Sequence, residues 1–411
     1  MRVLILSQYY EPEPIPKPGE LAAELRRRGH DVTVVTGLPN YPSGDLYPGY
    51  RLGWLQREQL DGIPVVRTFE YPYHGTRMLG RILNYFSFMC TAPFGLRRVG
   101  PVDVIYVWHP PLTVGVAAWV MSRMRRIPFV YDVQDIWPES GILSGMLKRG
   151  AFVRAMEFLE RFVYRKAHHI FVVTEGARRN LVAKGVPQDR VTVMPHWVDD
   201  GLFTPVDVRE RTALRAALGW EGRFVVAFAG NIGLVQGLES VIDAIQQLPA
   251  DSPVLLSLIG DGTDRARLQQ IVAHRGLSAR VQFAGRQPPD RMPGLLAATD
   301  ALLVHLRHSD LTDLVIPTKT LAYLAAERPI IMAMTGAAAE LILAAEAGVV
   351  VPPEDPGRLA DAILRLAASA DADRAAMGRR GRSYLEAHFT RGRVILQYES
   401  LLKEVAATPA R

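Results

Sequence analysis

The chain has 411 residues, of which 48% are hydrophobic and 22% charged, and its formal net charge is +6. This length exceeds one ordinary hydrophobic core, so two domains of about 200 residues are expected. The single cysteine, Cys90, excludes an internal disulfide and favours a reducing, cytoplasmic compartment. A membrane-spanning helix is also excluded, because the longest apolar runs reach only about half of the ~20 residues required.

The excess positive charge lies in the first half of the chain. Residues 1–200 carry 25 Lys and Arg against 19 Asp and Glu, whereas the remainder carries 23 of each. Many of these cations alternate with apolar residues on expected helices, a pattern typical of contact with an anionic membrane surface. Solvated helix faces explain the same pattern equally well. No nucleic acid partner is expected, since no recognised binding module accompanies the charge.

Along the chain, short β-branched runs alternate with amphipathic segments, which indicates parallel sheets covered by helices. In the first half, strands are expected at residues 3–6, 31–36, 64–69, 102–107, 128–132, 170–174 and 191–194. The second half repeats the pattern, with strands expected at 224–229, 254–259, 280–284, 301–305, 329–332 and 349–351. The predicted fold class is therefore α/β, with two doubly wound, Rossmann-like domains.

The segment 196–209 has few periodic apolar positions and is the expected linker. It predicts an N-terminal domain over 1–204 and a C-terminal domain over 205–387. Apolar residues within 391–405 fall on one face of a helix, and this C-terminal helix, about 388–411, is expected to pack back on the first domain. Because ligands of doubly wound sheets bind at strand carboxyl ends, the two domains are expected to face a central cleft.

Two motifs in the second half point to a phosphate. A glycine-containing loop, Gly230 to Gly237, follows an expected strand, and its backbone amides can approach an anion closely. Farther along, Pro317 and Thr318 begin a helix whose first-turn amides, capped by Thr318 and joined by Lys319, form an anion site. Neither the Gly230 loop nor Gly260-Asp261-Gly262 completes the dinucleotide-binding fingerprint.

Metal-binding patterns are absent from the sequence. The histidines at 168, 169, 305 and 308 lack matching acidic residues, so they are expected to lie at the surface or in ordinary hydrogen bonds. We therefore expect neither a metal nor another cofactor.

Nine sequence blocks occur in an order that supports a family resemblance. They are RGHDVTVVT at 28–36, PNYP at 39–42, NY at 84–85, DVQDIWPES at 132–140, HWVD at 196–199, GNIG at 230–233, GDG at 260–262, PTK at 317–319 and VPPED at 351–355. Nearly the whole chain resembles family 4 of the retaining glycosyltransferases, which have the GT-B fold. Within that family it is most similar to the L-fucosamine transferases of bacterial surface polysaccharide synthesis.

The resemblance implies metal-independent transfer of a sugar from a nucleotide diphosphate donor to a lipid-linked or surface-polysaccharide acceptor, with the anomeric configuration retained. In this scheme the base stacks near Gly285 and Arg286, the ribose lies beside Ala322, and the diphosphate meets the amides at Gly233 and Leu234. The full set of donor-binding residues that it implies is Gly230, Asn231, Gly233, Leu234, Gly285, Arg286, Asp310, Asp313, Thr318, Lys319 and Ala322.

Three residues of the first domain are further candidates. Asp135 follows a strand and is expected to hydrogen-bond the acceptor or to orient its loop. His109 lies one position beyond the family's sugar-contacting histidine and is expected to face the cleft, with a structural position at a helix start as the alternative. Lys17 supplies the one positive charge of the first loop, where the family shows a pair of glycines.

Two departures from the family pattern bear on activity. Ala322 stands where most members hold the ribose with a glutamate, and Leu234 stands where the family supplies an arginine to the diphosphate. These replacements leave open a catalytically decayed nucleotide-binding or scaffolding homologue. A nucleotide-sugar epimerase, which shares the two-domain plan, is a less favoured alternative. In each case a cytoplasmic location is expected, and for the transferase peripheral attachment at the inner membrane face is considered.

Overall fold

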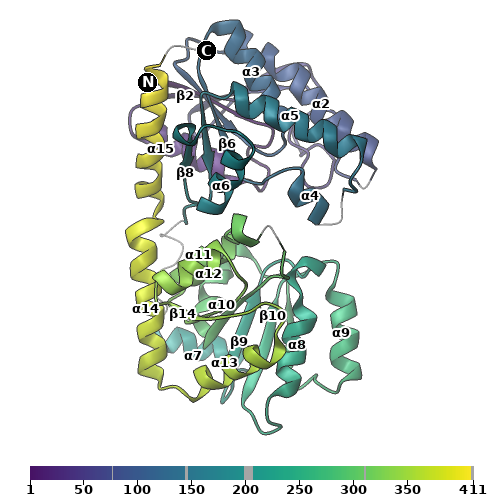
Figure 1. The fold of residues 1–411 in the computed structure, drawn as a ribbon, viewed down its shortest axis with the longest axis vertical. Helices are drawn as coiled ribbons and strands as arrows, with labels where there is room; N and C mark the ends of the chain where they lie inside the picture. Colours follow the sequence, from purple (N-terminus) through teal and green to yellow (C-terminus); the bar gives the residue numbers. More distant parts are fainter. Residues whose placement is uncertain (76, 144–146, 199–206, 310–311, 409–411) are drawn as a thin grey trace. The chain divides into compact units, whose positions relative to one another are not determined.

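The chain folds into two compact units in a computed structural model that describes residues 1–75, 77–143, 147–198, 207–309 and 312–408. The first unit comprises Met1–Pro195 together with Val394–Arg411, and the second comprises His196–Arg393. The boundary between the units falls after Pro195, and the chain returns to the first unit at Val394, in the part of the chain that Figure 1 draws in yellow.

The first unit is built on an eight-stranded sheet in the order β3-β4-β2-β1-β5-β6-β7-β8. Apart from β3, its strands run parallel, and most of their residues are buried because helices cover both faces. The strands are β1 Arg2–Ser7, β2 Asp31–Thr36, β3 Leu55–Leu60, β4 Ile63–Thr68, β5 Val104–Trp108, β6 Phe129–Val133, β7 His169–Val172 and β8 Val191–Val193.

Strand β3 is the one that the sequence pattern did not predict. It pairs antiparallel with β4 at the edge of the sheet, and its side chains are exposed or half-buried. An edge strand facing solvent has no need of the β-branched composition that marks buried strands. The sequence does carry a hairpin signal, since Asp61-Gly62 joins the two strands with positive φ angles of 47° and 77°.

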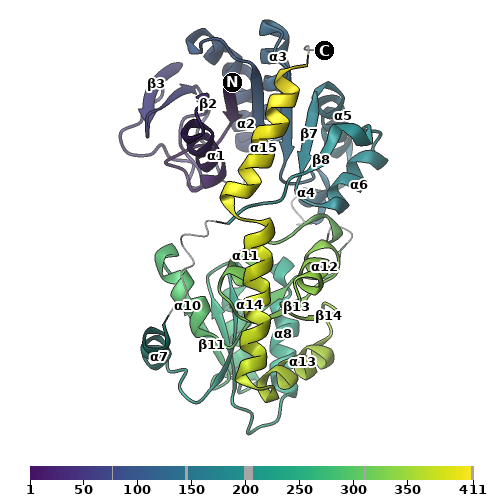
Figure 2. The ribbon, with the colours of Figure 1, turned by 90° about the vertical axis from the view of Figure 1, so that its left-hand side faces the viewer.

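The helices of the first unit include α15, which comes from the far end of the chain. Figure 2 shows α15 lying along the first sheet, while α2, α3 and α5 form a group in Figure 1. Their bounds are α1 Pro16–Arg27, α2 Met78–Gly95, α3 Thr113–Arg125, α4 Glu139–Leu143, α5 Ala151–Lys166, α6 Glu175–Ala183 and α15 Arg391–Ala406.

A buried carboxylate anchors α15 to the sheet. Asp132, in β6, accepts hydrogen bonds from the hydroxyls of Tyr106 and Tyr398, the latter at 3.0 Å, and from the amide of Gln134 at 2.6 Å. Burial raises the pKa of Asp132 to about 6, although these three donors oppose the rise. Asp132 is therefore a structural residue that ties the C-terminal helix to the first unit.

The second unit holds a six-stranded parallel sheet in the order β11-β10-β9-β12-β13-β14, which is the doubly wound arrangement. The six strands expected here are confirmed to within one residue at each end. They are β9 Phe224–Ala229, β10 Val254–Ile259, β11 Val281–Gly285, β12 Ala301–His305, β13 Ile330–Ala333 and β14 Gly348–Val351. Two Rossmann-like domains of α/β class are thus confirmed.

Side-chain alternation along β9 explains the layers of the second unit. Phe224, Val226 and Phe228 belong to the core on one side of the sheet, with α8, α9 and α13. Val225, Ala227 and Ala229 belong to the core on the other side, with α10, α11, α12 and α14. The helices are α7 Val208–Ala217, α8 Leu238–Gln247, α9 Arg265–His274, α10 Met292–Ala298, α11 Thr318–Ala325, α12 Ala337–Ala344, α13 Pro356–Ala368 and α14 Asp371–His388.

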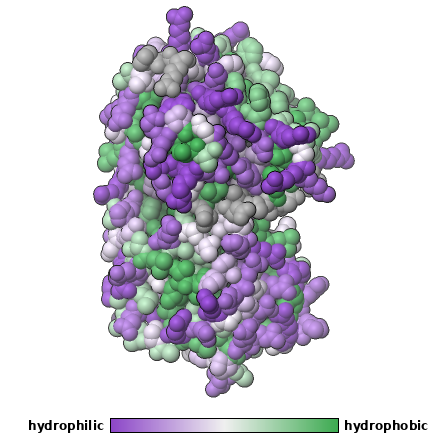
Figure 3. Space-filling model, viewed as in Figure 1, coloured by the Kyte–Doolittle hydropathy of each residue, from purple (hydrophilic) through white to green (hydrophobic). Residues whose placement is uncertain are grey.

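The surface of the first unit mixes charged residues with apolar ones, as Figure 3 shows in its upper part. Large apolar side chains are exposed on α2, α3 and α5. Among the residues that the structure describes, no helix combines the length and the apolar composition needed to cross a lipid bilayer.

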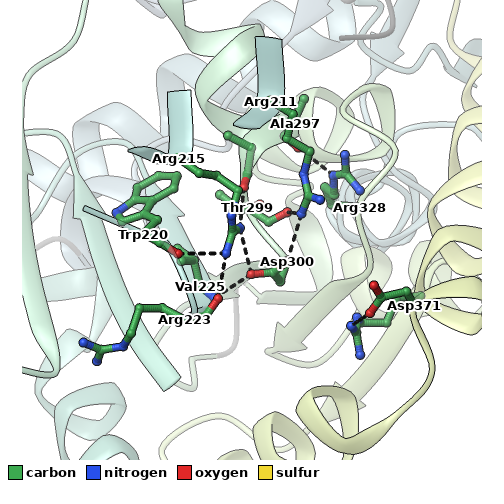
Figure 4. Close-up of polar contacts among 12 residues, drawn as sticks. Arg211, Arg215, Trp220, Arg223, Val225, Ala297, Thr299, Asp300, Arg328 and Asp371 are labelled. Carbon is green, nitrogen blue, oxygen red and sulfur yellow. Dashed lines mark hydrogen bonds and ion pairs between the residues drawn. The ribbon is translucent and has the colours of Figure 1, made fainter. Parts of the chain in front are cut away.

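An ion-pair cluster at the amino end of the second sheet secures α7 (Figure 4). Asp300 accepts hydrogen bonds from Arg211 and Arg215, each at 2.9 Å, and from the backbone N–H of Val225 at 2.8 Å. Because Asp300 directly precedes β12, this cluster stabilises the edge opposite the strand carboxyl ends.

Candidate functional site: a cavity at the carboxyl edge of the second sheet

The second sheet reverses its strand order between β9 and β12. In doubly wound sheets, loops diverge at this point and leave a crevice outside the strand carboxyl ends. A cavity of about 540 Å³ lies there, a size suited to a small molecule. Its lining residues are Ala229, Gly230, Asn231, Ile259, Gly260, Asp261, Arg286, Gln287, Met292, Leu296, Lys319, Ala322 and Tyr323.

Two glycine-containing loops form one wall of the cavity. One follows β9 at Gly230, and the other follows β10 at Gly260. Their backbones interlock, since the N–H of Ile232 donates to the carbonyl of Asp261 at 2.8 Å. A Cβ atom at Gly260 would lie 1.9 Å from the carbonyl oxygen of Gly230, and one at Gly262 would lie 2.3 Å from that of Ile232. Glycine is therefore required at 260 and 262 by backbone packing, and the wall exposes main chain to a ligand.

Lys319 is one of two positively charged residues of the described chain that line this cavity, the other being Arg286. Its ammonium lies 3.6 Å from the centre of the Phe228 ring and 3.4 Å from the side-chain oxygen of Gln236. None of the ion pairs formed by the described residues includes Lys319, and burial lowers its pKa from 10.5 to about 7. A largely enclosed ammonium that pairs with no carboxylate in the described part of the chain is suited to receive an anion from outside.

Helix α11, which carries Lys319, is fixed to the end of β9 by Tyr323. The Tyr323 hydroxyl accepts the backbone N–H of Ala229 at 2.7 Å, and the side chain is buried. Ala322 precedes it and lines the cavity, so the position where the family resemblance implies a glutamate does face this site. No signal in the sequence pattern singled out Tyr323.

The other predicted donor residues take different positions. Arg286 lines the cavity, and Gly285 ends β11 with a φ of 70°. Gly233 and Leu234 lie outside the lining, and Leu234 is 56% exposed at the start of a 3-10 helix, Leu234–Gln236. The structure thus brings together five predicted residues, which are Gly230, Asn231, Arg286, Lys319 and Ala322.

The predicted capping role of Thr318 is wrong. Pro317 occupies the position before the first helical residue, and no side chain caps α11 there. Thr318 is already within the helix and is exposed. Two predicted acids lie in the segment that precedes α11. Asp310 lies outside the described residues, and Asp313 belongs to the 3-10 helix Thr312–Leu314, where its side chain is not described.

His305 braces the loop that follows Gly230. Its Nδ1 lies 2.6 Å from the carbonyl oxygen of Gln236, and its Nε2 lies 3.3 Å from the backbone N–H of Glu354. Burial lowers the pKa of His305, which fits a neutral ring that donates through Nδ1 and accepts through Nε2. The ring therefore ties the loops after β9 and β14 to β12, and its ordinary hydrogen-bonded state agrees with the expectation from sequence.

Asp135 lines a separate cavity of the first unit, beside Trp108 and Trp137. Its carboxyl is accessible within this concave surface, yet the surrounding protein raises its pKa through desolvation. His109 is only 2% exposed and is not among the lining residues; its ring packs 5.6 Å from that of Tyr131, and burial lowers its pKa to about 3.

Lys17 lies in α1 and forms an ion pair with Glu20, with 3.2 Å between its ammonium and the carboxylate. No feature of this pair identifies a ligand. The roles expected for Asp135, His109 and Lys17 stay predictions.

Glu70 forms a buried polar cluster beneath the carboxyl edge of the first sheet. Its Oε1 accepts hydrogen bonds from the amides of Gln8, Asn40 and Asn84, at 2.9, 3.0 and 2.6 Å. Desolvation nevertheless raises the pKa of Glu70 to about 8. Two of the resemblance blocks, at 39–42 and 84–85, thus supply amide donors to this carboxyl, a role that sequence alone did not indicate.

Comparison with known proteins matches each half of the chain to a family model. Residues 18–197 match the family model described as "Glycosyl transferase 4-like domain", and residues 210–384 match "Glycosyl transferases group 1". A putative colanic acid biosynthesis glycosyl transferase, WcaI of Escherichia coli, is 29% identical over 78% of this chain and 80% of its own length. The probable glycosyltransferase WbjE of Pseudomonas aeruginosa is 28% identical over 77% of each.

Solved structures share the fold across nearly the whole chain. Anabaena HepE, solved in complex with UDP, superposes with a TM-score of 0.73 at 20% identity, covering 98% of this chain and 100% of that one. WaaG, a glycosyltransferase involved in lipopolysaccharide biosynthesis, superposes with a TM-score of 0.69 at 16% identity, covering 99% of this chain and 100% of that one. The fold is thus that of GT-B glycosyltransferases, as expected.

The relatives differ in the sugars and acceptors that their names mention, so the L-fucosamine branch stays a prediction. The two family models leave few residues unmatched between positions 18 and 384, and they correspond in order to the two units of the fold. The chain belongs to the glycosyltransferases that combine a 4-like domain with a group 1 domain.

Proposed function

We propose that the protein transfers a sugar from a nucleotide diphosphate donor to a lipid-linked or surface-polysaccharide acceptor, without a metal and with retention of the anomeric configuration. One observation carries the donor assignment: Lys319, which pairs with no carboxylate of the described residues, faces the same cavity as the main-chain wall at Gly230. That combination suits a ligand with both a negatively charged group and a flat or ring-shaped part.

Lys319 would act on the leaving group. When the sugar departs, the diphosphate gains negative charge at the oxygen that leaves. A fixed ammonium in an enclosed, low-dielectric site stabilises that charge more than water does, which lowers the barrier to transfer. Burial prepares Lys319 for this step, since the same desolvation that lowers its pKa strengthens its attraction to an arriving phosphate.

We assign acceptor binding to the first unit because of the position of Asp135. This residue follows β6 at the carboxyl edge of the sheet and is accessible within a cavity. A carboxylate there can accept a hydrogen bond from an acceptor hydroxyl and so orient its oxygen for attack. Retention and metal independence rest on the family resemblance alone.

Ala322 favours a second candidate function, which is nucleotide binding without transfer. It lines the cavity at the position where the resemblance implies a ribose-binding glutamate. Loss of one charged hydrogen bond costs about 1.5 to 3 kcal/mol, which weakens a donor site without abolishing it.

A panel of UDP, GDP, ADP and dTDP sugars, incubated with a polyprenyl-diphosphate-linked saccharide and followed by mass spectrometry, separates the two candidates. We expect transfer from at least one donor, unchanged in EDTA, with the product's anomeric configuration established by NMR. Tight binding of a nucleoside diphosphate by calorimetry, with neither transfer nor donor hydrolysis across the panel, would support the second candidate. Inversion of configuration would contradict the proposed mechanism.

A further inference from the structure

The cavity that contains Asp135 has walls that are mostly apolar or aromatic. It measures about 490 Å³, and Asp135 is the one charged residue among the described residues that line it. A sugar hydroxyl placed against the aliphatic and phenylalanine side chains of these walls would lose water without gaining a partner. The lining residues are Tyr9, Ile15, Tyr41, Ile82, Tyr85, Phe86, Trp108, Pro110, Pro111, Leu112, Thr113, Asp135, Trp137, Phe152, Ala155, Met156, Phe158 and Leu159.

The two ends of the cavity differ in chemistry. Tyr9, Trp108 and Asp135 come from the carboxyl edge of the first sheet, where the polar groups are found. The opposite wall is supplied by α2 and α5, and its rim is apolar and exposed, with Phe158 at 66% and Phe86 at 46%. Figure 3 shows apolar side chains at the surface of the first unit in this region.

The apolar rim continues beyond the cavity. Leu79 and Leu83 of α2 are outside the lining and are 68% and 46% exposed. Large apolar side chains gathered around a cavity are unfavourable in water and mark a binding surface for an apolar molecule. A hydrocarbon chain that enters between α2 and α5 would cover them.

A cation lies beside this cavity. Arg81 of α2 directly precedes the lining residue Ile82 and lies one helical turn before the lining residue Tyr85, so Arg81 and Tyr85 share a face of the helix. Its Nε donates to the carbonyl oxygen of Gly75 at 3.0 Å, and none of the ion pairs among the described residues includes it. Arg81 thus remains available for an anionic group next to the apolar chain.

We propose that the cavity binds the prenyl chain of a prenyl-phosphate-linked acceptor. The chain lies between α2 and α5, a phosphate contacts Arg81, and the saccharide reaches toward Asp135. Apolar walls, a neighbouring cation and a carboxylate at the sheet edge match the three parts of such a molecule. The inference rests on the proposed function, because that function supplies the polyprenyl-linked acceptor from which the prenyl chain is taken as the occupant.

Farnesyl phosphate in aqueous solution is a suitable probe, since it carries both a prenyl chain and a phosphate. Trp108 and Trp137 line the cavity, so binding is expected to change the intrinsic tryptophan fluorescence. Ala155→Phe fills the space from an exposed lining position and should weaken binding by at least about tenfold. Ala183→Phe, at an exposed position of α6 outside the lining, is the matched control and should bind like the wild type.

Arg81→Gln tests the phosphate contact. The variant should bind farnesyl phosphate about tenfold or more weakly than the wild type does, and its affinity for farnesol should be unchanged. The reason is that only the phosphate contacts the guanidinium. Dodecyl phosphate serves as the comparison for an unbranched chain, and should bind more weakly than farnesyl phosphate. Equal affinity for the two would overturn the prenyl assignment.

The outcomes separate this inference from the proposed function. Binding of a nucleoside diphosphate by calorimetry, with no fluorescence response to farnesyl phosphate, would overturn the inference and leave the donor site intact. Equal affinity of Ala155→Phe and the wild type would also overturn it, since the probe would then bind elsewhere. If no nucleoside diphosphate binds, the proposed function fails, whatever farnesyl phosphate does. Circular dichroism of each variant confirms that it folds.

Discussion

Replacing Lys319 with methionine should weaken nucleotide binding and stabilise the empty protein. The side chain loses its charge but keeps a similar length and apolar stem. A charged hydrogen bond to a phosphate contributes about 1.5 to 3 kcal/mol, so we expect the affinity for the best-binding nucleoside diphosphate to fall by roughly 10- to 150-fold. Isothermal titration calorimetry measures this loss directly.

Lys319→Met should weaken nucleotide binding but increase the stability of the empty protein. Burial lowers the pKa of Lys319 from 10.5 to about 7. Its cost to the folded state is therefore absent above pH 10.5, grows as the pH falls, and is fully present below pH 7. The shift sets an upper bound of about 5 kcal/mol, and the side chain's partial solvent access reduces it. We expect Lys319→Met to stabilise the empty protein by about 1 to 3 kcal/mol at pH 7, measured by urea unfolding.

The protein should also take up a proton when it binds a nucleotide. At pH 8.5 most Lys319 side chains are neutral in the empty protein, and a bound diphosphate restores their charge, so uptake should approach one proton. The nucleotide contributes little, because its terminal phosphate titrates near pH 6. The uptake is measured by calorimetry in two buffers that differ in ionisation enthalpy, and Lys319→Met should abolish it.

Lys403→Met provides the control. Lys403 is 55% exposed on α15 and pairs with Glu399, so its loss should change neither nucleotide affinity nor proton uptake. Equal nucleotide affinity in Lys319→Met and the wild type would refute the assignment of Lys319 as the phosphate partner. Binding at pH 8.5 without proton uptake would show that Lys319 stays neutral or lies away from the diphosphate.

Three further predictions follow from other contacts. Ala322→Glu should tighten nucleoside diphosphate binding about tenfold or more in calorimetry, because it restores a charged partner for the ribose. Tyr323→Phe should destabilise the protein by about 1 to 3 kcal/mol in urea unfolding, since the buried N–H of Ala229 loses its partner. Glu70→Gln should gain stability relative to the wild type between pH 5 and pH 9, because the raised pKa of Glu70 makes its ionisation unfavourable in the folded state. Unchanged affinity of Ala322→Glu would show that the ribose is held elsewhere. A Tyr323→Phe variant as stable as the wild type would contradict the anchoring of α11. For Glu70→Gln, a stability difference that is constant with pH would show that the carboxyl titrates normally.

The sign for Glu70 follows from its burial. A carboxyl whose folded pKa is about 8 contributes no penalty below its unfolded value near 4.5, and the cost of ionising it rises through this interval and is complete above pH 8. The upper bound on this cost of ionising Glu70 in the folded protein is about 5 kcal/mol. Glutamine can accept the same amide hydrogen bonds without titrating.

Most strands were predictable because their physical cause is local. A strand buried on both faces must be a short run of β-branched or other apolar residues, as β9 and β10 are. The edge strand β3 escaped prediction for the converse reason, since its side chains meet solvent and its register depends on the hairpin with β4. Local signals likewise marked the glycine loop at Gly230 and the helix with Lys319.

The sequence by itself determined the two parallel sheets, the order of their loops and the residue types available at the cavity that contains Lys319. Only the tertiary structure decided that Lys319 pairs with no carboxylate among the residues that the structure describes, that Tyr323 fixes its helix to β9, and that amides from three separate segments surround Glu70. Strand periodicity and glycine turns depend on neighbouring residues in the chain. Charge pairing and desolvation depend on which distant residues approach each other, and these set the pKa values on which the proposed chemistry depends.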